Sequence, residues 1–195
     1  MDARRGVATA ALVLGLLCCG TAAAADPGNS VAPTTNTKAL NDKVLNAFKL
    51  LAVRESAPAG VDLLEEAANE GSDDAKYFLG WYYVQGMFAK PDYDKALQYL
   101  EQVSGELRNA ATILMGVAYA EGSKTRAPDM EKTERIFKDV ASRLDAQFEA
   151  RQRMPQPADA EAMVSDMTKM RRWYEDRVVL QGYAKKYGVS LDGSR

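Results

Sequence analysis

Apolar residues recur every three or four positions along most of the chain between residues 37 and 187, and no segment alternates with a period of two. This spacing puts apolar side chains on one face of an α-helix. The first stripe predicts a helix over roughly residues 37–54, and its members are Leu40, Val44, Phe48 and Leu51. The pattern therefore predicts an all-α protein.

Glycine and proline divide the pattern into successive helices. Ser72 is placed to cap the third helix, because a serine oxygen accepts hydrogen bonds from the exposed amides of a first turn. Proline suits a first turn, where its missing N–H would have no partner. The predicted helix ends are Gly71, Gly86, Gly105 and Gly122, and the predicted starts are Pro91-Asp92 and Pro128-Asp129.

Two stretches of the chain repeat one another. AKYFLGWYYVQG aligns with ATILMGVAYAEG so that Gly80 matches Gly116 and Gly86 matches Gly122, each 36 positions later. PDYDKALQYL then aligns with PDMEKTERIF at an offset of 37, so one residue is inserted in the loop. Two helices per repeat of this length are typical of a helical solenoid.

The matched glycines predict two different roles. A glycine inside a helix costs roughly 1 kcal/mol relative to alanine. Its recurrence at Gly80 and Gly116 predicts that the backbone of a neighbouring helix comes close at these points. Gly86 and Gly122 are predicted to end their helices in the left-handed conformation.

The repeat resembles the Sel1-like repeat, a relative of the tetratricopeptide repeat. The resemblance covers roughly residues 59–141, and the second unit departs from the pattern at Met115, Thr133 and Ile136. The matching positions are Ala75, Leu79, Gly80, Tyr83, Gly86, Asp94, Lys95, Ala96 and Tyr99. The resemblance implies a short solenoid of helical hairpins over residues 37–150, with an N-terminal capping helix and a C-terminal capping helix and tail over residues 151–195.

The N-terminus has the pattern of a signal peptide. Arg4 and Arg5 precede an apolar run of about 14 residues, too short to span a bilayer, and small residues follow it. We predict a signal peptide over residues 1–25, export to the periplasm, and a flexible leader over residues 26–36. A buried N-terminal helix is one alternative. Lipid attachment at Cys18 or Cys19 is another, although no small residue precedes either cysteine closely enough to favour it.

Composition narrows the chemistry. Without residues 1–25 the chain keeps 23 basic residues against 26 acidic ones, a mild excess that argues against nucleic-acid binding. It has no histidine, and both cysteines lie in the predicted signal peptide, which excludes the usual zinc sites and thiol catalysis. No cofactor or metal is predicted.

The chain contains no arrangement that predicts an enzyme. Its adjacent carboxylates, Glu65-Glu66 and Asp73-Asp74, are interpreted as solvated faces because helix neighbours point about 100° apart. A serine–lysine dyad stays open, since its members need not be close in sequence.

The resemblance also implies a partner surface, because first helices line the concave face in this repeat class. The residues that it assigns to partner binding are Tyr77, Trp81, Val84, Gln85, Ile113, Val117 and Glu121. The alternative is that the protein covers this groove itself. A predicted helix over residues 158–187 is the candidate cover, with an apolar stripe that consists of Met163, Met167, Met170, Tyr174 and Val178. Arg171, Arg172 and Arg177 are predicted to lie on the solvent-exposed side of that helix.

The sequence as a whole predicts a non-catalytic module that binds a protein partner in the periplasm. Exported members of the resembling family include inhibitors of toxins, assembly adaptors and envelope regulators. The most specific expectation is an immunity protein that neutralises a toxin effector. The alternative is a scaffold or adaptor in an envelope assembly.

Overall fold

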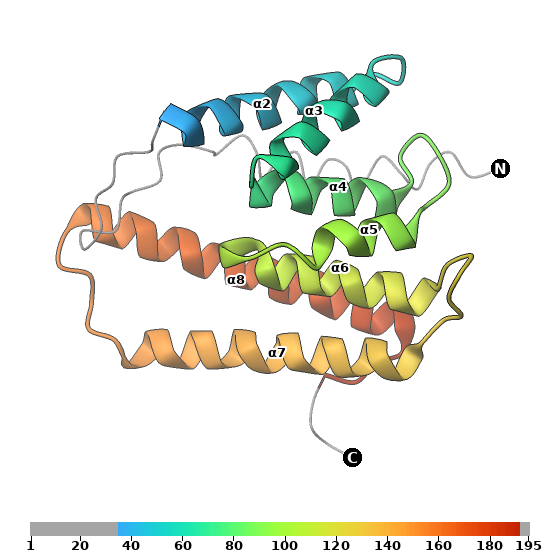
Figure 1. Ribbon diagram of the computed structural model, residues 1–195. Coiled ribbons are helices and arrows are strands. Elements are labelled where there is room, and N and C mark those ends of the chain that lie inside the picture. The colour runs from blue at the N-terminus through green and yellow to red at the C-terminus, as the bar shows by residue number, and fades with distance from the viewer. Residues whose placement is uncertain (1–34, 192–195) are drawn as a thin grey trace.

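The computed structural model describes residues 35–191 (Figure 1). The predicted signal peptide over residues 1–25, and all but the last two residues of the predicted leader, lie outside this range. The described residues contain helices and no strand, which confirms the all-α fold for this part of the chain. The elements are α2 (Thr35–Leu51), α3 (Ala57–Asn69), α4 (Asp73–Gln85), α5 (Tyr93–Leu100), the 3₁₀ turn η1 (Gly105–Leu107), α6 (Arg108–Glu121), α7 (Met130–Arg153) and α8 (Ala160–Tyr187).

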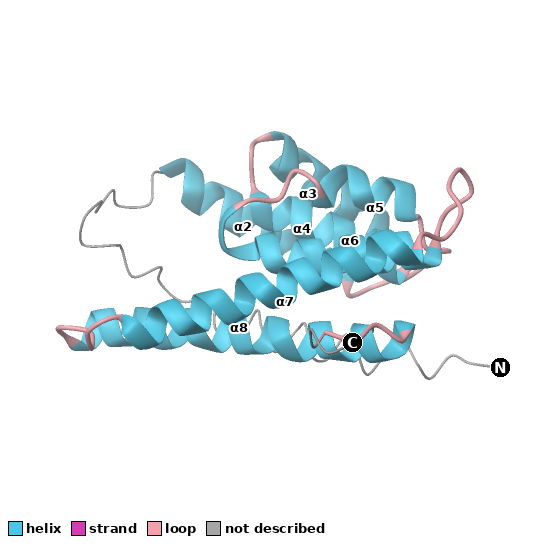
Figure 2. Cartoon of the chain, turned by 90° about the horizontal axis from the view of Figure 1, so that it is seen from below, coloured by secondary structure: helices cyan, strands magenta, loops and turns pink. Residues whose placement is uncertain are grey.

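The helices form stacked hairpins. Figure 1 shows α2 with α3, α4 with α5 and α6 with α7 as successive antiparallel pairs. Neighbouring hairpins touch through α3 and α4 and through α5 and α6, and the first helices α4 and α6 also contact one another. The last helix, α8, does not extend the stack but turns back along α7 and α6 (Figure 2).

The glycines inside α4 and α6 are sites of close approach. A Cβ added to Gly80 would lie under 3.0 Å from side-chain atoms of Leu100, and one added to Gly116 would lie equally close to the ring of Phe137. Both glycines are buried inside helices. The neighbouring group is thus a side chain from the second helix of the same hairpin, and not the helix backbone that the sequence interpretation expected.

The glycines at the ends of α4 and α6 allow a sharp turn into the following loop. Gly86 has φ 60° and ψ 46°, which is left-handed. Gly122 has φ 71° but an extended ψ of −169°, so it shares only the positive φ. An added Cβ would lie 2.6 Å from the Pro91 nitrogen at Gly86 and 2.7 Å from the Pro128 nitrogen at Gly122. Both positions therefore exclude a side chain.

A second set of contacts recurs in the two repeat units. Asp92 caps α5 by accepting a bond of 3.0 Å from the Lys95 amide, and Asp129 caps α7 in the same way through the Lys132 amide at 2.8 Å. The amide of each aspartate also donates to the carbonyl of a tyrosine in the preceding helix, Tyr83 or Tyr119. The ammonium of Lys95 or Lys132 lies over the ring of that tyrosine. One local network thus fixes the angle of both hairpins.

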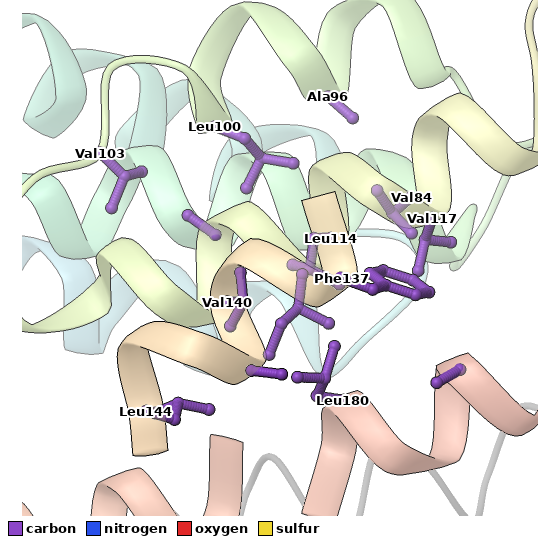
Figure 3. Packing of buried hydrophobic residues seen from close by; sticks show 14 residues of the cluster. Val84, Ala96, Leu100, Val103, Leu114, Val117, Phe137, Val140, Leu144 and Leu180 are labelled. Atoms are coloured by element: carbon purple, nitrogen blue, oxygen red, sulfur yellow. The ribbon is translucent and has the colours of Figure 1, made fainter. Parts of the chain in front are cut away.

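Buried side chains form two main clusters in the described residues. One joins α2, α3 and α4 and includes Leu64 and Leu79. The other joins α4 through α8, and Figure 3 shows Leu180 of α8 pointing toward the α7 residues of this cluster. Leu180 is fully buried, so α8 contributes to the core and does not merely lie on its surface.

Candidate functional site: the first-helix face and its cover

The seven residues predicted to bind a partner lie on one surface of α4 and α6, which we call the first-helix face. Val84, Ile113 and Val117 are buried in the cluster that joins α4 through α8. Tyr77 and Trp81 are partly buried against the same cluster. Gln85 is half-buried and Glu121 is exposed, and these two residues lie toward the C-terminal ends of α4 and α6.

The C-terminal half of α8 covers the first-helix face. Leu180 and Ala184 are buried in the same cluster as Ile113 and Val117. Three aromatic residues of α8 pack against that cluster, namely Trp173, Tyr183 and Tyr187. The structure therefore answers a question that the sequence left open, because the chain fills this face with its own last helix.

Polar contacts hold the two ends of this cover. Glu121 accepts from the Lys186 ammonium at 2.8 Å and from the Tyr187 hydroxyl at 2.6 Å. These hydrogen bonds lower the pKa of the Glu121 carboxyl. Near the other end, the Arg172 guanidinium donates to Glu106 of η1 at 2.8 Å. Such pairs are partly exposed and contribute little individually, so their main effect is to fix the register of α8.

Two of the arginines on α8 do not lie on its solvent-exposed side. Arg172 reaches η1 through Glu106, and Arg177 lies 3.3 Å from both the Ala141 carbonyl and the Asp145 carboxylate of α7. Arg171 pairs within its own helix, with Glu175 at 3.4 Å. The prediction of a solvent-exposed position was wrong for Arg172 and Arg177. Both residues lie at the edge of the packed face of α8, and their long side chains reach neighbouring elements.

A carboxyl group is buried beneath the cover. Asp176 is 8% exposed, and its Oδ2 atom has no hydrogen-bond partner among the described residues. Burial raises the pKa of Asp176 to about 7; the positive charge of Arg172 opposes this rise and the negative charge of Glu175 adds to it. The carboxyl also acts on Tyr77 of α4, whose pKa is raised by burial and by the nearby Asp176 charge. Asp176 thus lies at the contact between α8 and the first-helix face.

The methionine-rich stripe, which the sequence offered as the apolar side of a candidate cover, faces away from the core. Tyr174 is 65% exposed and Met167 is 63% exposed. Near the free end of the α7–α8 pair this stripe borders a groove of about 520 Å³. The groove is lined by Phe148, Arg151, Gln152, Gln156, Pro157, Met163, Asp166, Met167 and Met170.

Three of the four adjacent carboxylates have structural partners. Glu65 accepts from the Tyr99 hydroxyl at 3.1 Å, and Glu66 lies 3.5 Å from the Lys43 ammonium. Asp73 accepts from the amide and hydroxyl of Ser104 and from Lys76. Within residues 35–191 no cluster of metal-ligating side chains occurs, and no helix there is long and apolar enough to cross a bilayer.

Sequence reasoning missed the most unusual group of the site. An aspartate on a helix is ordinarily solvated, and Asp176 follows Glu175 in a charged segment. One signal was available, since Trp173, Leu180 and Ala184 share a face with Asp176 at helical spacing. That face is less apolar than the methionine stripe, so hydrophobicity alone selects the other one.

The stacked hairpins and the repeat define a helical-repeat solenoid, a class that presents extended binding surfaces. Over 107 residues the chain is 33% identical to the Sel1-repeat-containing protein YjcO of Escherichia coli (strain K12). Proteins named YjcO from Escherichia coli O157:H7 and Shigella flexneri match with the same identity and length. The alignment covers 49% of this chain and 47% of the relative, so the chain spans about half the length of the curated relatives it matches. No family model and no solved structure matches the chain.

This similarity and the repeated residues support the Sel1-like repeat family for this chain. Sel1 repeats in turn indicate a protein–protein interaction module.

Proposed function

We propose that the chain is a non-catalytic periplasmic module that binds a protein partner through the first-helix face. The observation that supports this proposal is the surface formed by Tyr77 and Trp81 of α4 with Ile113 and Val117 of α6, on which the C-terminal half of α8 already lies. Grooves of this kind bind helices through apolar anchors at helical spacing. A partner helix would reach Tyr77 and Trp81 by displacing the C-terminal half of α8.

The most specific form of the proposal is an immunity protein that inhibits a toxin effector. The slight excess of acidic residues fits an inhibitor of a basic partner. The second candidate is a scaffold or adaptor in an envelope assembly, which the exposed methionine stripe favours because it gives the chain a second apolar surface. Deletion of the gene separates the two roles. An inhibitor is required only beside cells that deliver the toxin, whereas a scaffold is required in pure culture.

Site-specific photo-crosslinking in intact cells tests the binding surface. A crosslinker at Gln85, at the edge of the first-helix face, is expected to capture a protein, and the capture is expected to disappear in Trp81→Ala. The control position is Gln98, which is exposed on α5. Circular dichroism of Trp81→Ala checks that the helices are retained.

The exposed methionine stripe of α8 is the alternative binding surface, and the same experiment can detect it. If capture at Gln85 survives Trp81→Ala but is lost in Met167→Ser, the chain binds through the outer surface of α8. That result would reject the first-helix face as the binding surface.

A further inference from the structure

We propose that the C-terminal half of α8 is a pH-sensitive cover of the first-helix face, closed when Asp176 is uncharged and released when Asp176 is ionised. This inference rests on the proposed function of that face, because it describes how the face becomes available. It concerns a movement within one chain and can be tested without a partner.

Asp176 lies buried at the contact between α8 and the first-helix face. Its carboxyl is 8% exposed, and Oδ2 is buried without a hydrogen-bond partner in the described part of the chain. An ionised carboxylate can only accept hydrogen bonds, and burying it unpaired is costly. A protonated carboxyl carries no charge, so the same contact costs much less. The closed arrangement therefore favours the neutral form.

The cation closest in sequence on the same face, Arg172, is shared among several carboxylates. Arg172 lies one helical turn before Asp176, where a helical ion pair would be expected. Its guanidinium instead donates to Glu106 of η1 at 2.8 Å. Its positive charge also favours the ionised form of Asp74 at the start of α4, so a single arginine is the counter-charge of several carboxylates.

The charged groups around the contact do not replace this missing partner. From α4, Tyr77 offers a phenol whose pKa is raised, and from η1, Glu106 accepts from Arg172 and carries no positive charge to offer. Arg177, which follows Asp176 on α8, is held by Asp145 of α7 at 3.3 Å. On α6, Glu121 is engaged by Lys186 at the far end of the cover. Burial raises the pKa of Asp176 to about 7, so the group changes charge near neutral pH.

The direction of the effect follows from proton linkage. An uncovered Asp176 would regain an ordinary pKa near 3.8. The closed form therefore binds a proton that the open form has already lost between about pH 4 and pH 7, and opening becomes more favourable as the pH rises. Between about pH 5 and pH 8 the opening equilibrium is expected to increase by roughly 10- to 100-fold.

Hydrogen exchange on the purified chain tests the cover. After correction for intrinsic chemical exchange, the amides of residues 172–187 and 77–85 are expected to lose protection by roughly 10- to 100-fold between about pH 5 and pH 8. Asp176→Asn is expected to remain protected across this range. The matched control is Glu161→Gln, an exposed carboxylate in the first turn of the same helix, which should follow the wild type.

Tryptophan emission supplies an independent readout. The chain has two tryptophans, Trp81 on α4 and Trp173 on α8, and both pack against the covered cluster. Opening should shift their emission to longer wavelength as the pH rises, in the wild type and not in Asp176→Asn. If Asp176→Asn loses its helical circular dichroism, Asp176→Leu takes its place.

Amide protection that is independent of pH in the wild type would overturn the proposal of a pH-sensitive cover. The same holds if Asp176→Asn shows the same pH dependence as the wild type. Capture of a partner at Gln85 is a separate measurement. A pH-sensitive cover with no partner would reject the proposed function and leave this inference standing.

Discussion

Replacing Gly80 by alanine tests how the repeat packs, because the structure gives the environment of the new methyl group. An added Cβ would lie under 3.0 Å from Cγ and Cδ2 of Leu100, which is fully buried and has little room to move. Overpacking of this kind costs about 1–3 kcal/mol. Alanine recovers roughly 1 kcal/mol of helix preference. We expect Gly80→Ala to lower the free energy of unfolding by about 1 kcal/mol.

Gly182 provides the matched control. It also lies inside a helix, α8, but a Cβ added there would meet nothing within 4 Å. Gly182→Ala should therefore stabilise the protein by up to about 1 kcal/mol. Because the helix-preference contribution is the same in both variants, the difference between them isolates the cost of the contact with Leu100. That difference should be about 1–3 kcal/mol.

A double-mutant cycle completes the test. Leu100→Ala alone should cost about 2–5 kcal/mol, because it leaves a cavity in the core. In the double variant the Gly80→Ala methyl group occupies part of that cavity, so the combined loss should be smaller than the sum by about 1–3 kcal/mol. Urea unfolding followed by circular dichroism gives all of these values. The packing argument fails if Gly80→Ala stabilises the chain as much as Gly182→Ala, or if the double variant is additive.

Three further predictions address other parts of the fold. Gly86→Ala should lower the free energy of unfolding by about 1–3 kcal/mol in urea, because φ is positive there and the Pro91 nitrogen lies 2.6 Å from the new Cβ; an unchanged midpoint would contradict this. Phe137→Ala should cost about 3–5 kcal/mol by the same measurement, because the ring is fully buried against Gly116, and a loss below about 1 kcal/mol would contradict it. Relative to Asp176→Asn, the wild type should lose stability as the pH rises from about 4 to about 7, by at most about 4 kcal/mol, since its raised pKa means that only the folded state retains the proton. Thermal unfolding at several pH values checks this sign, and a constant difference would refute it.

The hairpins could be predicted from sequence because their signals are local. Gly86 requires a positive φ, and Asp92 caps the helix that follows it, within a few residues of one another. The repeat of these signals 36 or 37 positions later fixed the two-helix unit. What the repeat did not provide was the identity of the group that approaches Gly80, since the contact with Leu100 depends on how two helices cross.

The orientation of α8 could not be predicted from the pattern of apolar residues. Its most apolar stripe is exposed, whereas the face that packs on the solenoid also carries Asp176. Hydrophobicity alone selects the exposed stripe as the packed one, because it does not include the contacts that Arg172 and Arg177 make with neighbouring elements. The seven predicted binding residues do lie together on α4 and α6, and their role in binding a partner stays a prediction.

The return of α8 across the stack changes how the protein should unfold. In an open solenoid each unit touches only its neighbours, so the ends can fray while the middle persists. Here Lys186 and Arg172 of α8 bind Glu121 and Glu106, which lie 65 and 66 positions earlier in the chain. Loss of this tie would remove support from α4, α6 and α7 together. Once α8 has been released, the hairpins formed by α4 to α7 should therefore melt together, and not one at a time.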